Sequence, residues 1–342
     1  MRKMLVIFVT LCVTLSFASC SSSTAIPSAS TNNSQNLSES APAESAQNVK
    51  WPTGDITVVV AASSGGGTDI QARIIAEYFN KYTGHNLIIE NQSSGSGTVA
   101  YEQVRNAKPD GKTLLYYHSS MYISYYSGIY QHNILENFSP IAKITESYGN
   151  AICVPGNSPY TTLDELVTAA KKSPNTIIAG IQIGGFPEYL IKLLEKDGEC
   201  TFKNVDAGNA SDRLTSLLGG HIDVACINAA NAVQYEPGGE LKILGICAKE
   251  RVDAYPNWPS TTELGYPSVI IPNGQFFYAP IGTDPSLAQS MNDVFTKIGA
   301  DPEFQAATLN NGVMPDVKNY EGTINAAHEA DQNIKNILSL VQ

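Results

Sequence analysis

From residue 51 onward, short apolar runs alternate with amphipathic stretches. The first two runs, residues 56–60 and 87–89, are β-branched or aliphatic throughout, as buried parallel strands are. Between them, residues 70–82 carry apolar side chains at the i, i+4, i+5 and i+8 positions counted from Ile70, which is the spacing of an amphipathic helix. The pattern predicts a parallel strand–helix–strand unit, with the turn after each strand at the same edge of the sheet.

The alternation continues through the rest of the chain and predicts an α/β fold. Further strands are expected at residues 113–117, 141–144, 150–154, 176–181, 224–227, 241–248 and 276–279. A helix is expected over residues 162–172, with Thr161 or Thr162 as its N-cap and Pro174 ending it. Since this part of the chain is longer than one hydrophobic core usually serves, we expect two lobes.

A glycine-rich turn follows each of the first two strands. Helix N-termini in such turns carry unsatisfied N–H groups and a partial positive charge, so two of them at one edge could hold a carboxylate or phosphate. The candidate ligand-binding residues there are Ser63, Ser64, Gly66, Gly67, Thr68, Asp69, Asn91, Ser94, Gly95, Ser96 and Gly97. The alternative is that the turns are only structural, with Thr68 as an N-cap and Asp69 paired with Arg73 one helical turn later.

The motifs of covalent, metal and nucleotide chemistry are missing from the sequence. Gly67 is followed by Thr68 and Asp69, without the lysine of a phosphate-binding loop, and no Gly-x-Gly-x-x-Gly or Gly-x-Ser-x-Gly motif occurs. The five histidines have no ligand spacing. We therefore expect no enzyme, no cofactor and no metal.

The cysteines argue against zinc and redox motifs, since none forms a Cys-x-x-Cys pair. Cys153, Cys226 and Cys247 lie in strand-like runs, where a buried free thiol packs as a small hydrophobe. Disulfides remain the alternative.

The N-terminus has the pattern of an export signal. Arg2 and Lys3 precede an apolar stretch, and two small residues precede Cys20, so we expect residues 1–19 to be a signal peptide and Cys20 to be lipidated. The alternative is an ordinary signal peptide with a chance cysteine. Residues 20–50 are rich in Ser, Ala, Asn and Pro and are predicted to be a disordered tether.

The charge balance excludes some partners. Loss of residues 1–19 leaves 19 basic against 32 acidic side chains, a formal charge of −13, which disfavours binding to nucleic acid.

From the export signal and Cys20, the mature protein is expected to lie outside the cytoplasm, anchored to a membrane by its lipid.

The order of several short motifs resembles the substrate-binding proteins of tripartite tricarboxylate transporters, also called the Bug family. These motifs include Trp51-Pro52, Gly65–Asp69 with Arg73, Pro109–Leu114, Phe138–Ala142, Thr162–Leu166, Gly220–Val224, Trp258–Gly265 and Tyr278–Pro280. The resemblance covers residues 51–342 and rests on order and spacing, because no single motif is specific.

This resemblance implies a two-lobed periplasmic-binding-protein fold of type II, with a ligand cleft between the lobes. Lobe 1 would consist of residues 51–150 plus 277–342, and lobe 2 of residues 151–276. The ligand would be a small carboxylate (a dicarboxylate, an amino acid or an aromatic acid), delivered to a large and a small membrane subunit by a monomeric binding protein. The family's remaining cleft loops correspond to residues 183–188 and 205–208, which adds Gly184, Gly185, Glu188, Asp206 and Gly208 to the candidate site.

Departures from the family pattern bear on the ligand. Ala61 and Ala62 stand where the family commonly has proline and an aromatic residue, which removes an aromatic wall. Glu188 and Asp206 replace a histidine and part of a Pro-Tyr-Lys-Gly segment. If both faced the cleft, they would favour a ligand with an amine over a tricarboxylate, because like charges in a desolvated site are costly; alternatively, Glu188 is a first-turn helix residue that faces solvent.

A second class of function stays open. A sensor that binds the same carboxylate but signals through a membrane receptor would have the same sequence features. Neighbouring genes for large and small transporter subunits would favour the transport role.

Overall fold

The computed structural model describes residues 50–147 and 149–341. The expected signal peptide, Cys20 and nearly all of the expected tether lie outside these residues. Within them, no helix combines the length and apolar character needed to cross a membrane. The folded part begins as predicted, because Trp51 is buried against Phe79 and Phe295 and its indole Nε1 donates to the Gly111 carbonyl at 2.9 Å.

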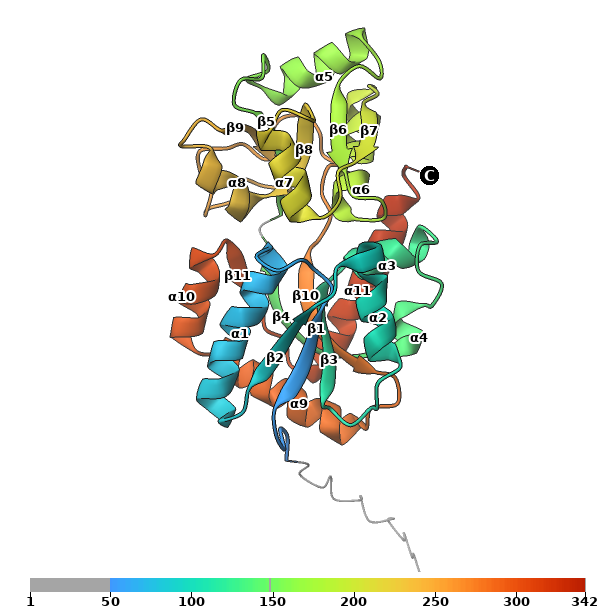
Figure 1. Cartoon of the computed structure of the whole chain (residues 1–342), viewed down its shortest axis with the longest axis vertical. Helices are drawn as coiled ribbons and strands as arrows, with labels where there is room; N and C mark the ends of the chain where they lie inside the picture. The colour runs from blue at the N-terminus through green and yellow to red at the C-terminus, as the bar shows by residue number, and fades with distance from the viewer. Residues whose placement is uncertain (1–49, 148, 342) are drawn as a thin grey trace, which may run out of the picture. The chain divides into compact units, whose positions relative to one another are not determined.

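One sheet of six strands carries the start and the end of the described chain (Figure 1). In spatial order its strands are β11 (Val313–Pro315), β4 (Phe138–Ser147), β10 (Gly274–Pro280), β3 (Thr113–His118), β1 (Ile56–Val60) and β2 (Leu87–Asn91). The strands β2, β1 and β3 are parallel, whereas β10 runs antiparallel to β3 and β4. The predicted parallel unit of β1, α1 and β2 is therefore confirmed.

Eight helical segments surround this sheet. They are α1 (Gly67–Thr83), the short 3₁₀ segment η1 (Ser94–Gly97), α2 (Thr98–Arg105), α3 (Ser120–Tyr126), α4 (Ile134–Asn137), α9 (Pro285–Gly299), α10 (Pro302–Asn310) and α11 (Tyr320–Leu338). Proline follows an aspartate N-cap at the start of both α9 and α10, which fixes where these helices begin.

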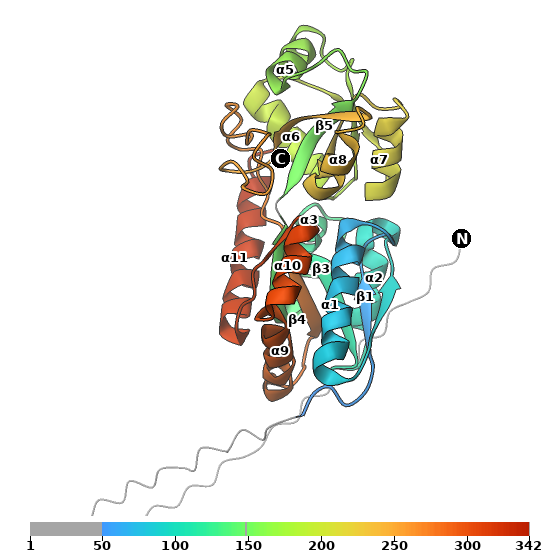
Figure 2. The same cartoon turned by 90° about the vertical axis from the view of Figure 1, so that its left-hand side faces the viewer.

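A second sheet of five strands is formed by the middle of the chain (Figure 2). Its strands are β7 (Lys203–Asp206), β6 (Ile178–Ile181), β8 (Val224–Asn228), β5 (Asn150–Pro155) and β9 (Leu241–Ile246). Its helices are α5 (Leu163–Lys172), α6 (Phe186–Gly198), α7 (Ala210–Leu218) and α8 (Ala229–Tyr235). The N-cap of α5 is Thr162, which forms a capping box with Glu165.

The two sheets confirm the predicted α/β class, and each strand expected from the apolar runs is present. Two strands were not predicted: β7 is an edge strand of mostly exposed polar residues, and β11 has only three residues. The chain enters the second sheet between Ser147 and Asn150 and has returned to the first by Gly274, three residues before the expected boundary at 277. The division into two lobes at these crossings stays a prediction.

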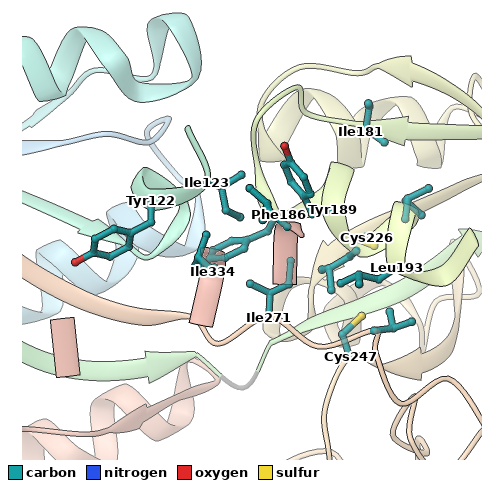
Figure 3. Close-up of a cluster of buried hydrophobic side chains, with 14 of the residues drawn as sticks. Tyr122, Ile123, Ile181, Phe186, Tyr189, Leu193, Cys226, Cys247, Ile271 and Ile334 are labelled. Atoms are coloured by element: carbon teal, nitrogen blue, oxygen red, sulfur yellow. The ribbon is translucent and has the colours of Figure 1, made fainter. Parts of the chain in front are cut away.

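The described residues belong to one compact unit, and a continuous apolar cluster joins its two sheets. Figure 3 shows where this happens: Phe186 and Tyr189 of α6 lie close to Ile123 of α3 and Ile334 of α11. The end of α11 lies beside α6 in both Figure 1 and Figure 2. On the face of each sheet that does not contact this cluster, a further apolar cluster packs, one per sheet.

The four described cysteines, Cys153, Cys200, Cys226 and Cys247, are buried free thiols. This confirms the expectation for the three in strand-like runs, and the disulfide alternative is not supported.

Candidate functional site

A cavity of about 120 Å³ lies between the two sheets and is lined by residues from both. A single water needs only about 10–15 Å³ on the same measure, so the cavity has room for a small molecule. Its lining is unusually rich in side-chain amides: Gln71, Asn150, Gln182, Asn209, Asn228, Asn231, Gln234, Asn273, Gln275 and Asn311. The described residues contain no group of three His, Cys, Asp or Glu side chains placed to hold a metal ion.

The first glycine turn forms one wall of the cavity. Ser63, Gly66, Gly67 and Thr68 line it, whereas Ser64 is exposed outside the lining. The N-cap of α1 is Gly66, which makes no side-chain capping bond, so Thr68 is not the N-cap. The first-turn N–H groups of this 17-residue helix therefore lack a side-chain cap and lie at the cavity.

Asp69 lies behind this wall and does not line the cavity. Its Oδ2 accepts from the Gly65 N–H at 2.9 Å and from Arg73 Nε at 3.0 Å, and its Oδ1 accepts from Asn91 Nδ2 at 3.0 Å. Burial raises the pKa of Asp69, but the hydrogen bonds from Arg73, Gly65 and Asn91 lower it by more, so the carboxylate stays ionised. The predicted pairing with Arg73 is confirmed, and the role of Asp69 is to hold the turn.

Asn91 has the same supporting role. Its Nδ2 donates to the Ala62 carbonyl at 3.2 Å as well as to Asp69, which ties the end of β2 to the end of β1. It does not line the cavity.

The second glycine turn lies beside the cavity, to which it contributes only Ser93. Ser94, Gly95, Ser96 and Gly97 are not part of the lining. The last three have positive φ angles, and Ser96 Oγ donates to the Ile183 carbonyl at 3.0 Å, which links the two sheets' loops.

The candidates on the second sheet's loops also lie outside the lining. The cavity is lined instead by residues close to them in the sequence, namely Gln182, Phe186, Pro187 and Asn209. The predicted residues that do not line it are Gly184, Gly185, Glu188, Asp206 and Gly208. Glu188 accepts from the Gly184 N–H at 2.7 Å and pairs with Lys192 at 2.7 Å. Asp206 is exposed and accepts from the Gly208 N–H at 3.1 Å. Neither carboxylate lines the cavity. Glu188 is a first-turn residue of α6, as in the alternative, but its side chain is only 14% exposed and so does not face solvent.

Arg213 is a cavity residue that was not predicted from the sequence. It lies on α7, is 4% exposed and lines the cavity. Its Nε donates to the Cys226 carbonyl at 3.1 Å and its Nη1 to the Gly208 carbonyl at 3.2 Å. Among the described residues, no carboxylate lies within 4.0 Å of its guanidinium. Burial lowers the pKa of Arg213 to about 10, which leaves it charged at neutral pH.

The local sequence explains why this guanidinium is buried. Asn209 caps α7 by accepting from the Ser211 and Asp212 N–H groups, which fixes the start of the helix. Arg213 then lies one turn before the buried Leu217, on the apolar face of the helix. A charged residue at such a position is a signal in the sequence that could have identified it.

His118 is a second residue that was missed. It ends β3 and lines the cavity, with its ring stacked on Tyr117 (centroids 3.9 Å apart) and on Phe186 (4.9 Å). Burial lowers its pKa to about 3, so the imidazole is neutral. Since Nδ1 accepts from the Ser120 N–H at 3.2 Å, the ring proton is assigned to Nε2.

In two of the lining amides, the side-chain oxygen has no hydrogen-bond partner among the described residues. They are Gln71, which is 1% exposed, and Asn273, which is 8% exposed. Because an unpaired buried polar atom costs about 1–3 kcal/mol, a bound molecule that pairs with these amides would gain from them.

A comparison with protein families decides what kind of protein has this cavity. Residues 71–341 match the family described as the tripartite tricarboxylate transporter family receptor. The chain belongs to this receptor family. The resemblance inferred from the order of short motifs is thus confirmed over most of the folded part.

The chain is also similar to a curated relative and, in fold, to solved structures over most of its length. The Cupriavidus necator protein named "UPF0065 protein in gbd 5'region" is 27% identical over 296 residues, which cover 86% of this chain and 89% of that protein. The fold is similar to MatC from Rhodopseudomonas palustris with bound malate (TM-score 0.77, 23% identity, 85% of this chain and 100% of that one). It is also similar to an R. palustris protein with adipate (TM-score 0.78, 20% identity, 85% and 98%).

Proposed function

We propose that the protein is an extracytoplasmic solute-binding lipoprotein that holds a small carboxylate in this cavity and delivers it to the membrane subunits of a tripartite tricarboxylate-type transporter. The observation that carries the proposal is Arg213. Its buried guanidinium forms no salt bridge among the described residues and interacts only at longer range with Asp206, so a carboxylate ligand would supply a close counter-charge.

The opposite wall supports the same ligand chemistry. The first turn of α1 presents backbone N–H groups without a side-chain cap, and a helix N-terminus attracts anions. Donors from both sheets around one cavity suit a protein in which a ligand draws two lobes together.

The relatives add the class of ligand and the setting. Structures with a similar fold carry malate or adipate, both small carboxylates. The family description supports delivery to a transporter. Three expectations complete the proposal: anchoring through Cys20 and the tether over residues 20–50, which the sequence pattern predicts, and action as a monomer, which the family resemblance implies.

The experiment is a calorimetric titration of the purified protein with malate and with adipate, repeated on Arg213→Met. Methionine keeps much of the buried volume while removing the charge. We expect at least one of the two acids to bind, and Arg213→Met to weaken that binding at least 30-fold, since removing one partner of a buried charge pair costs about 2–5 kcal/mol.

The control is Arg105→Met, which removes a guanidinium that pairs with Glu102 away from the cavity. It should leave the affinity unchanged. Two results would contradict the proposal. One is a folded Arg213→Met protein that binds the acid as tightly as the wild type does, and the other is a wild type that binds no small carboxylate.

A further inference from the structure

Of the described residues that line the cavity, Arg213 alone carries a full charge. The lining contains no Lys, Asp or Glu, and its histidine, His118, is neutral. Ten of the lining residues are instead amides. The cavity therefore offers one full positive charge and many uncharged hydrogen-bonding groups.

The two groups that attract an anion belong to segments that approach each other beside the cavity. Ser63 Oγ, in the turn before α1, donates to Oδ1 of Asn209, the N-cap of the helix that carries Arg213, at 3.4 Å. Gly67, the first residue of α1, lies next to Asn228, whose Cγ would be 3.7 Å from a Cβ at that glycine. Arg213 Nε itself is bonded to the Cys226 carbonyl, two residues before Asn228.

One of the two amides whose oxygen lacks a partner lies on α1 itself, and the other lies next to a central strand of the first sheet. Gln71 lies one turn further along α1, and Asn273 directly precedes β10. Both are more than nine-tenths buried, and each has a side-chain oxygen without a partner among the described residues. An amide pairs well with a hydroxyl or another amide, whichever way its oxygen and nitrogen are oriented.

We infer that the cavity selects a monoanion: one carboxylate held between the N-terminus of α1 and Arg213, on a molecule whose far end is uncharged and forms hydrogen bonds through hydroxyl or amide groups. This inference rests on the proposed function and narrows its ligand class. A second carboxylate at the far end would be removed from water with no counter-charge in the lining, which is costly. An apolar far end would leave the buried amides unpaired.

The test uses three six-carbon acids that differ only at the far end: adipate with a carboxylate, its monoamide adipamate with an amide, and hexanoate with a methyl group. Each is titrated into the purified protein at pH 7. We expect adipamate to bind at least tenfold more tightly than either of the others.

A variant that adds a second charge sharpens the test. Gln234 on α8 lines the cavity and is exposed, so a longer side chain is tolerated there. Gln234→Lys should reduce the preference for adipamate over adipate at least tenfold. Gln289→Lys makes the same charge change on the exposed part of α9, outside the lining, and should leave the preference unchanged.

Each outcome decides a different statement. If wild-type protein binds adipate as tightly as adipamate or more tightly, the inference is overturned while the proposed function stands. If hexanoate equals adipamate, the role of the amides is overturned. If the folded protein binds none of the three acids, nor malate, the proposed function fails and the inference fails with it.

Discussion

Two walls of the cavity differ in whether their charged residue reaches the ligand space. One wall is formed by β1 and α1, and the other by α7. On the first wall, the carboxylate of Asp69 accepts hydrogen bonds from Arg73, Gly65 and Asn91, and the groups of this wall that line the cavity are uncharged. On the second wall, Arg213 has no carboxylate partner among the described residues and lines the cavity itself. The type of a charged residue therefore does not reveal its role, whereas its partners do.

The comparison predicts that Asp69→Asn destabilises the protein. In either orientation the amide nitrogen of asparagine would face donors that now point at a carboxylate oxygen. Since Arg73 is about half exposed, which screens the pair, we expect a loss of about 2–3 kcal/mol at pH 7, measured by urea unfolding.

The dependence on pH provides the control. The pKa of Asp69 is lowered in the folded protein, so its contribution is present above the unfolded value of about 3.9 and is lost as the pH falls through the folded pKa. The difference between wild type and Asp69→Asn should shrink in acid. An equal difference at every pH would assign the loss to packing.

Much of the first wall could be predicted from the sequence because its parts are local. The apolar periodicity of residues 56–91 and the glycines between the elements gave β1, α1 and β2, and the spacing of four residues gave the Asp69–Arg73 pair. What the spacing could not show is which groups face the cavity, since a ligand role and a supporting role have the same pattern.

The second wall could not be predicted in the same way. Its amides come from strand ends and helix starts far apart in the sequence, such as Asn150, Asn209 and Asn228, and only the sheet topology brings them together. The resemblance to the family pointed to residues 183–188 and 205–208. Phe186 and Pro187 of the first range line the cavity, Glu188 and Asp206 do not, and Asn209 follows the second range. Arg213 alone had a local signal, its position on an apolar helix face.

His118, which lines the cavity from β3 and stacks on Phe186 of α6, should make stability depend on pH. Its folded pKa of about 3 lies below the unfolded value of about 6.5, so the unfolded chain binds the proton first. Below about pH 6.5 the unfolded chain is therefore favoured by protonation of His118, and the free energy of unfolding should fall further as the pH is lowered toward the folded pKa.

The variant His118→Asn tests this because an asparagine oxygen can accept from the Ser120 N–H in place of Nδ1. Urea unfolding of both proteins between pH 7 and pH 5 should show the wild type losing more stability than the variant as the pH falls. Parallel pH profiles would mean that His118 is protonated at no cost in the folded protein.

The smallest expected effect concerns Glu188, which extends the comparison to the second sheet's own loops. Its carboxylate is consumed by Gly184 and Lys192, as that of Asp69 is by its neighbours, so Glu188→Gln should cost only about 0.5 kcal/mol and change ligand affinity less than twofold. Lys192→Met, which removes the same ion pair from its other side, should match it in urea unfolding and in calorimetry. A tenfold loss of affinity for an amine-bearing acid in Glu188→Gln alone would show that this carboxylate reaches the ligand. A charged residue with its own partners could then still bind ligand on the second sheet, and the comparison of the two walls would not extend to it.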